Sequence, residues 1–185
     1  MLVDYGANIN HVSKDGLFAL KFAVQRRDLE FVKYFLSKNA DPLLVDNLNR
    51  NLLHIALNYA PTTSNSNLNI EKILVNEGVD VNGKDIRGRT PLHYLFVKFG
   101  NANSTAMIDP IKNVASYCAN RKVKLDEPDF WGKTPLHYAS QVAATISCIE
   151  LISKGAKIDA TDRYGNTALG ISILSGHVGH AIMLI

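Results

Sequence analysis

The chain has 185 residues, of which 46% are hydrophobic and 20% charged, and its formal net charge is +3. This composition is sufficient for one continuous core, and the charge is too small to indicate nucleic-acid binding by itself. No basic and apolar leader opens the sequence, and the most apolar stretch, residues 168–185, is interrupted by serine and histidine. Neither a signal peptide nor a membrane span is therefore predicted, and we expect an intracellular protein, cytoplasmic or nuclear.

A five-residue pattern, here called a tip, recurs along the chain and mostly reads Asp-x-x-Gly-x. The five tips occupy residues 13–17, 46–50, 85–89, 129–133 and 162–166, at steps of 33, 39, 44 and 33 residues. A residue suited to ending a helix stands seven positions before most tips, and the five residues in this slot are Gly6, Asn39, Gly78, Lys122 and Gly155. Because that interval is constant, the chain is predicted to consist of repeated units.

In chain order we expect a repeat remnant followed by four complete units and a truncated one. Their boundaries are about 1–12, 13–45, 46–84, 85–128, 129–161 and 162–185. In the best-matching unit, Thr134 caps a helix over 135–143 that has Pro135 in its first position, and a second helix covers 146–154. Helices this short are unstable alone, so the units must be stabilised by stacking on one another.

The sequence Thr-Pro-Leu-His occurs at residues 90–93 and 134–137, each time directly after a tip. This combination resembles the ankyrin repeat, which has a 33-residue period. The resemblance extends over the whole chain and is weaker where residues 18–21 and 51–54 depart from the motif. It implies an all-α solenoid of stacked helix-turn-helix units joined by β-hairpin loops. It also implies a protein-binding scaffold without catalytic activity.

His54, His93 and His137 recur in equivalent slots and could suggest a metal site. Packed helices lie about 10 Å apart, whereas metal–ligand bonds are near 2 Å, so one ion cannot join them. The resemblance implies instead that each histidine hydrogen-bonds around the helix N-cap. Residues 165–172 look like a phosphate-binding loop but lack its lysine, and no other catalytic motif occurs. No catalytic residue, metal or cofactor is predicted.

Two insertions lengthen the spacing, at about residues 60–67 and 99–110. Both are rich in polar residues and fall between the two helices of adjacent units. They represent either simple variation in loop length or a ridge that binds a partner.

The tips carry the strongest candidates for a binding site. Of the three variable residues in each tip, six in total are basic and one is acidic. The framework aspartates beside them offset much of this charge, which argues against nucleic acid as the ligand. Trp, Tyr and Arg often dominate interface energetics, although these rings could instead pack on neighbouring tips. The candidate partner-binding residues are Lys14, Arg50, Arg87, Arg89, Phe130, Trp131, Lys133, Arg163 and Tyr164.

We therefore predict a non-catalytic module that binds a peptide or protein surface through its concave face and tips. The expected ligand combines acidic and apolar residues. The alternative is a regulatory or targeting domain of a larger enzyme such as a kinase, ubiquitin ligase, acyltransferase or tankyrase-like ADP-ribosyltransferase. Apolar residues near both ends (Leu2, Val3, and residues 181–185) suggest a fragment of a longer protein that self-associates weakly through uncapped terminal repeats.

Overall fold

The computed structural model describes residues 5–60, 69–97 and 122–184 of the chain. Every regular element in these ranges is an α-helix, as predicted. The helices are α1 (Ala19–Gln25), α2 (Leu29–Ser37), α3 (Leu52–Asn58), α4 (Asn69–Asn76), α5 (Pro91–Val97), α7 (Pro135–Gln141), α8 (Thr145–Ser153), α9 (Ala168–Leu174) and α10 (Val178–Met183). Nearly all of the two predicted insertions lies outside the described residues.

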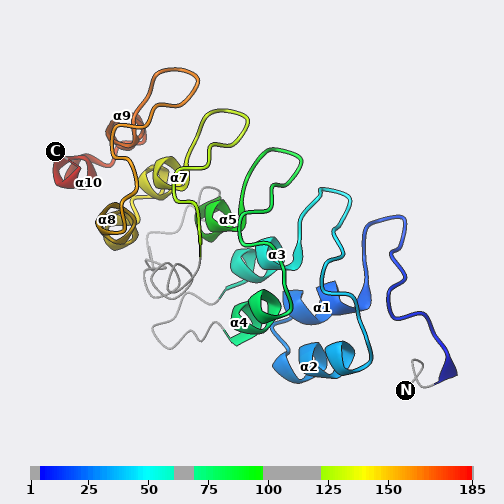
Figure 1. Ribbon diagram of the computed structural model, residues 1–185. Coiled ribbons are helices and arrows are strands. Elements are labelled where there is room, and N and C mark those ends of the chain that lie inside the picture. Colours follow the sequence, from blue (N-terminus) through cyan, green and yellow to red (C-terminus); the bar gives the residue numbers. More distant parts are fainter. Residues whose placement is uncertain (1–4, 61–68, 98–121, 185) are drawn as a thin grey trace.

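The helices stack into a solenoid with two rows (Figure 1). One row contains α1, α3, α5, α7 and α9, and each of these helices contacts the next along the row. The second row contains α2, α4, α8 and α10, and extended loops project from the first row on its other side. The predicted helices over 135–143 and 146–154 correspond to α7 and α8. The predicted all-α solenoid is confirmed.

Local sequence explains where these short helices begin and end. The Asn51 side chain accepts hydrogen bonds from the backbone N–H groups of Leu53 and His54 and so caps α3. Asn39 and Gly155, which follow α2 and α8, have φ angles of 60° and 97°. Asparagine thus adopts the left-handed conformation that glycine adopts in the equivalent slot.

A leucine-rich core runs between the two rows along the whole stack. Leu20, Leu53, Leu92, Leu136 and Leu151 are almost completely buried in it. In the described part of the chain, no helix is long and apolar enough to cross a membrane.

A buried ion pair joins the first helix pair to the second. The Glu71 side chain has no exposed surface, and the guanidinium of Arg27 hydrogen-bonds to both of its carboxylate oxygens. A further bond from Arg27 reaches the Ala56 carbonyl at 3.2 Å. This pair connects residues that are far apart in the sequence, across the first insertion.

Candidate functional site: a cleft beneath the tips

Each of the second to fifth tips is held in shape by the aspartate in its first position. In the third tip, the Oδ1 atom of Asp85 accepts hydrogen bonds from the backbone N–H groups of Arg87 at 2.7 Å and Arg89 at 2.9 Å. Asp46, Asp129 and Asp162 make the equivalent pair of bonds in their tips. The fourth residue has a positive φ, 76° at Gly88 and 54° at Asn49. In these tips the second and third side chains are exposed.

Neighbouring tips are also bonded to one another through their backbones. The N–H of Phe130 donates to the carbonyl of Arg87, and the N–H of Arg163 donates to that of Trp131, both at 2.9 Å. The same contact joins Ile86 to Leu48 at 3.0 Å. The second to fifth tips therefore form a connected row whose spacing is set by backbone atoms.

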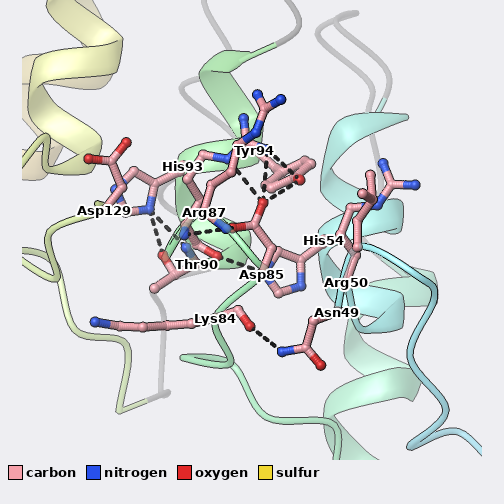
Figure 2. A network of polar contacts seen from close by, with 12 residues as sticks. Asn49, Arg50, His54, Lys84, Asp85, Arg87, Thr90, His93, Tyr94 and Asp129 are labelled. Carbon is pink, nitrogen blue, oxygen red and sulfur yellow. Dashed lines mark hydrogen bonds and ion pairs between the residues drawn. The ribbon is translucent and has the colours of Figure 1, made fainter. Parts of the chain in front are cut away.

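The repeated histidines fasten each helix to the following tip (Figure 2). His93 Nδ1 accepts the backbone N–H of Thr90 at 3.0 Å, and its Nε2 bonds to the Lys133 carbonyl, also at 3.0 Å. His54 and His137 make equivalent contacts to the carbonyls of Arg89 and Asn166. We call this contact the histidine staple. The bond to the N-cap is the role that the family resemblance implies, whereas the bond to the next tip was not predicted.

The staple histidines are neutral at physiological pH. Burial lowers the pKa of His54 and His93 to about 4, and the bonds to the next tip's carbonyl only partly oppose this shift. Since Nδ1 accepts a hydrogen bond, the neutral ring must carry its proton on Nε2 and donate it to the carbonyl. Within the described ranges, no group of three histidine, cysteine or acidic side chains is placed to hold a metal ion.

A cleft of about 390 Å³ lies beneath the third, fourth and fifth tips. The candidate residues that line it come from all three of these tips, and they are Arg87, Arg89, Trp131, Lys133 and Tyr164. The rest of the wall comes from α5, α7 and the residue that follows α7, namely Phe96, Val97, Tyr138, Gln141 and Val142. This cleft is the candidate site.

The cations around the cleft differ in how strongly they are bound to the framework. Arg89 donates to Asp85 Oδ2 from Nε at 3.0 Å and from Nη2 at 2.8 Å, and its side chain is only 11% exposed. The Tyr94 hydroxyl takes part in the same network, 2.8 Å from Asp85 (Figure 2). In the second tip, Arg50 is bound to Asp46 in the same way and does not line the cleft.

Lys133 occupies the equivalent position in the fourth tip but is bound differently. The framework carboxylate there, Asp129, receives the Tyr138 hydroxyl at 2.7 Å. The Lys133 ammonium lies 3.4 Å from the Gln141 side-chain oxygen, and the described residues show no ion pair between Lys133 and Asp129. Arg87 likewise has no ion-pair partner among them. Arg87 and Lys133 are therefore the cations whose charge is available to a ligand.

The other candidates lie outside the cleft. The Phe130 ring covers Gly88 of the preceding tip so closely that an added Cβ there would lie 2.8 Å from a ring carbon. Packing between tips thus accounts for much of this ring's position, although 55% of the residue is exposed. Lys14 and Arg163 are exposed and do not line the cleft.

Sequence reasoning missed the helical wall of the cleft, above all Tyr138. A signal was present, because tyrosine directly follows the staple histidine in two units, as Tyr94 and Tyr138. Each ring packs edge-on against the staple histidine of the preceding unit, with 5.1 Å between the centroids of Tyr94 and His54. In the next unit the distance between Tyr138 and His93 is 5.5 Å.

Stacked helix pairs, tips held by aspartate and histidine staples define a repeat scaffold of the kind that binds other proteins. The chain belongs to the ankyrin repeat family. A family model described as ankyrin repeats in three copies matches residues 1–85, and the single ankyrin repeat model matches residues 131–163.

Two viral ankyrin repeat proteins are similar to part of the chain. The protein from Fowlpox virus (strain NVSL) is 29% identical over 94 residues, which are 51% of this chain and 13% of the viral protein. The protein from Acanthamoeba polyphaga mimivirus is 27% identical over 124 residues, covering 52% of this chain and 16% of the viral protein. The match thus spans a small part of each relative.

Proposed function

We propose that the cleft beneath the third to fifth tips binds an extended segment of a partner protein. Ankyrin repeats generally mediate protein–protein interactions, and this chain carries such repeats. The observation that carries the proposal is the grouping of Trp131, Tyr164, Arg87 and Lys133 around one cleft. Aromatic and arginine side chains in a partly enclosed site are those that most often dominate binding energy.

The chemistry of the lining favours a segment with both acidic and apolar residues. Trp131 is 40% exposed and Tyr164 78% exposed, so both rings offer apolar surface that a ligand can cover. Arg87 and Lys133 supply positive charge that the framework has not neutralised. A carboxylate placed between these cations, with an apolar side chain against the Trp131 ring, satisfies both features.

Selection of peptides from a random displayed library on the immobilised chain tests this function. We expect enrichment of peptides that combine Asp or Glu with aromatic or aliphatic residues, and Trp131→Ala should abolish it. A matched control is Tyr5→Ala, which removes an aromatic ring that is 89% exposed at the far end of the stack. Enrichment of basic peptides, or equal enrichment on Trp131→Ala, would contradict the proposal.

A second candidate function is that of a targeting domain within a larger enzyme. The two relatives are longer polypeptides, of which the matched region is only 13% and 16%, and a protein of that length has room for a further domain. In such a protein the cleft would recruit the enzyme's substrate. The coding sequence on both sides of these 185 residues tests this directly, because a catalytic domain there would support it and an uninterrupted repeat array would not.

A further inference from the structure

The side chains that line the cleft divide into an exposed rim and a covered floor. The rim lies in the tips and consists of Arg87, Trp131 and Tyr164, all of which are exposed. The floor is the helical wall, where Phe96 has no exposed surface and Val142 is 7% exposed. Because the tips project beyond the row of helices (Figure 1), a ligand side chain that enters between the tips passes the rim first and points toward the floor.

The available cation of the fourth tip has its charge at the floor. The Lys133 ammonium is 3.4 Å from the Gln141 side-chain oxygen and 5.8 Å from the centre of the Tyr138 ring, and both residues belong to α7. An ammonium has three N–H donors, and the contact with Gln141 uses one of them. Among the described residues the ammonium makes no other hydrogen bond, so two donors remain for a ligand.

No acidic side chain is among the described residues that line the cleft. The framework aspartate of the fourth tip, Asp129, is only 5% exposed. Its oxygens accept hydrogen bonds from the backbone N–H groups of Trp131 and Lys133 and from the Tyr138 hydroxyl. The floor therefore presents an ammonium to a ligand without an exposed carboxylate beside it.

The rim and the floor together favour a ligand side chain with a flat apolar body and an anion at its far end. The Trp131 and Tyr164 rings offer apolar surface to the body, and the Lys133 ammonium offers donors to the anion. Aspartate and glutamate have the anion without the ring, whereas phenylalanine and tyrosine have the ring without the anion. We propose that the cleft recognises a phosphorylated tyrosine in the partner segment, with its ring at the rim and its phosphate at the floor.

This inference rests on the proposed function and specifies the ligand of the same cleft. A phosphate group carries about two negative charges and three acceptor oxygens, so it can use both remaining donors of Lys133. A carboxylate elsewhere in the segment can pair with Arg87 at the rim. The affinity of such a segment for the cleft therefore depends on whether its tyrosine is phosphorylated.

Two degenerate peptide libraries that differ by one phosphate test the inference. Both have random residues around a fixed centre, which is phosphotyrosine in one library and tyrosine in the other. The immobilised chain should retain the phosphotyrosine library, and retained peptides should bind about tenfold more tightly than their unphosphorylated forms. Equal affinity of the two forms would overturn the inference and leave the proposed function standing. If neither library is retained, and no acidic peptide is selected either, both are contradicted.

Lys133→Gln separates the floor cation from the overall charge of the tips. This variant should lose the preference for the phosphorylated form of a retained peptide. Arg163→Gln is the matched control, because Arg163 is an exposed cation of the next tip that does not line the cleft. It should keep the preference, and thermal melting should show that both variants are folded. An equal loss in the two variants would indicate general charge attraction and would overturn the inference.

Phosphate presented without a ring provides the last comparison. A phosphoserine library should be retained poorly, because its short side chain holds the phosphate near the peptide backbone and away from the floor. Phenyl phosphate should displace a bound phosphotyrosine peptide, whereas inorganic phosphate at the same concentration should not. If phosphoserine peptides bind as tightly, or if inorganic phosphate competes as well, the cleft binds anions without reading the ring, and the inference is wrong.

Discussion

The hydroxyl of Tyr138 lies 2.7 Å from Asp129 and donates its hydrogen bond to that carboxylate. One unit earlier, Tyr94 makes the same bond to Asp85, but Arg89 shares the same carboxylate oxygen. In the fourth tip, the described residues show no ion pair between Lys133 and Asp129, and the Lys133 ammonium lies toward the Gln141 side-chain oxygen. The fifth tip residue therefore pairs with the framework aspartate when it is arginine, whereas as lysine it keeps its charge available in the cleft.

Lys133→Arg should therefore weaken ligand binding even though the charge is kept. The longer, forked guanidinium can pair with Asp129 as Arg89 pairs with Asp85, and this withdraws it from the cleft. We expect a gain of up to about 1 kcal/mol in the free energy of unfolding. Urea denaturation and titration with a selected acidic peptide measure the two effects. Tighter peptide binding by this variant would contradict the assignment of Lys133 to the ligand.

Trp131→Ala should leave the fold intact and remove most of the binding energy. The ring is 40% exposed and lies in a tip outside the leucine core. If Trp131 is a hot spot, the loss is about 2 kcal/mol or more. Calorimetric titration with a selected peptide measures it, and the melting temperature serves as the folding control. Because Trp131 is the only tryptophan in the chain, its fluorescence should also shift when a peptide binds to the wild type.

Arg87→Ala should have a smaller effect that depends on salt. Arg87 is exposed at the rim of the cleft, where its charge accelerates the encounter with an acidic ligand more than it holds the complex together. The association rate should fall at low ionic strength, and the difference from wild type should fade as salt screens the charge. Stopped-flow fluorescence at several salt concentrations measures the rate. Lys14→Ala, in the remote first tip, should behave as the wild type.

Acid should destabilise the protein through the staple histidines. Burial lowers the pKa of His54 and His93 from 6.5 to about 4, so the unfolded chain binds more protons between these pH values. Their stabilisation is complete above pH 6.5 and is lost as pH falls toward 4, at a cost of roughly 3 kcal/mol for each ring. Urea denaturation at several pH values measures this slope.

The buried ion pair between Arg27 and Glu71 gives a prediction about the core. Glu71→Gln keeps the shape of the side chain but removes the charge that compensates Arg27. We expect the free energy of unfolding to fall by about 3 kcal/mol, because a largely buried ion pair loses one of its two charges. Denaturant unfolding measures the loss. Replacing both residues with apolar ones should restore part of it, whereas no recovery would mean that the pair makes a net contribution.

The sequence was sufficient to predict the solenoid and the position of its tips because those features are local. Helix caps, the glycine slots and the interval of seven residues each act within a few residues of the chain. The pairing of Arg27 with Glu71 could not be predicted, since it depends on how two units stack across an insertion. The packing of the Phe130 ring over Gly88 could not be predicted for the same reason. The sequence also could not show which cations are available to a ligand, because this depends on where the Tyr94 and Tyr138 hydroxyls lie.

The histidine staple bonds to the backbone carbonyl of a tip residue and does not involve the side chain of that residue. His93 holds the carbonyl of Lys133, the residue whose ammonium faces the cleft. The stacking of the units therefore depends on the backbone carbonyl of this residue, whereas the proposed ligand binding depends on its side chain. Mutation can therefore change the chemistry of the binding surface at Lys133 without removing the bond that the staple makes. A scaffold built in this way can acquire a new ligand in small steps, each of which keeps the protein folded.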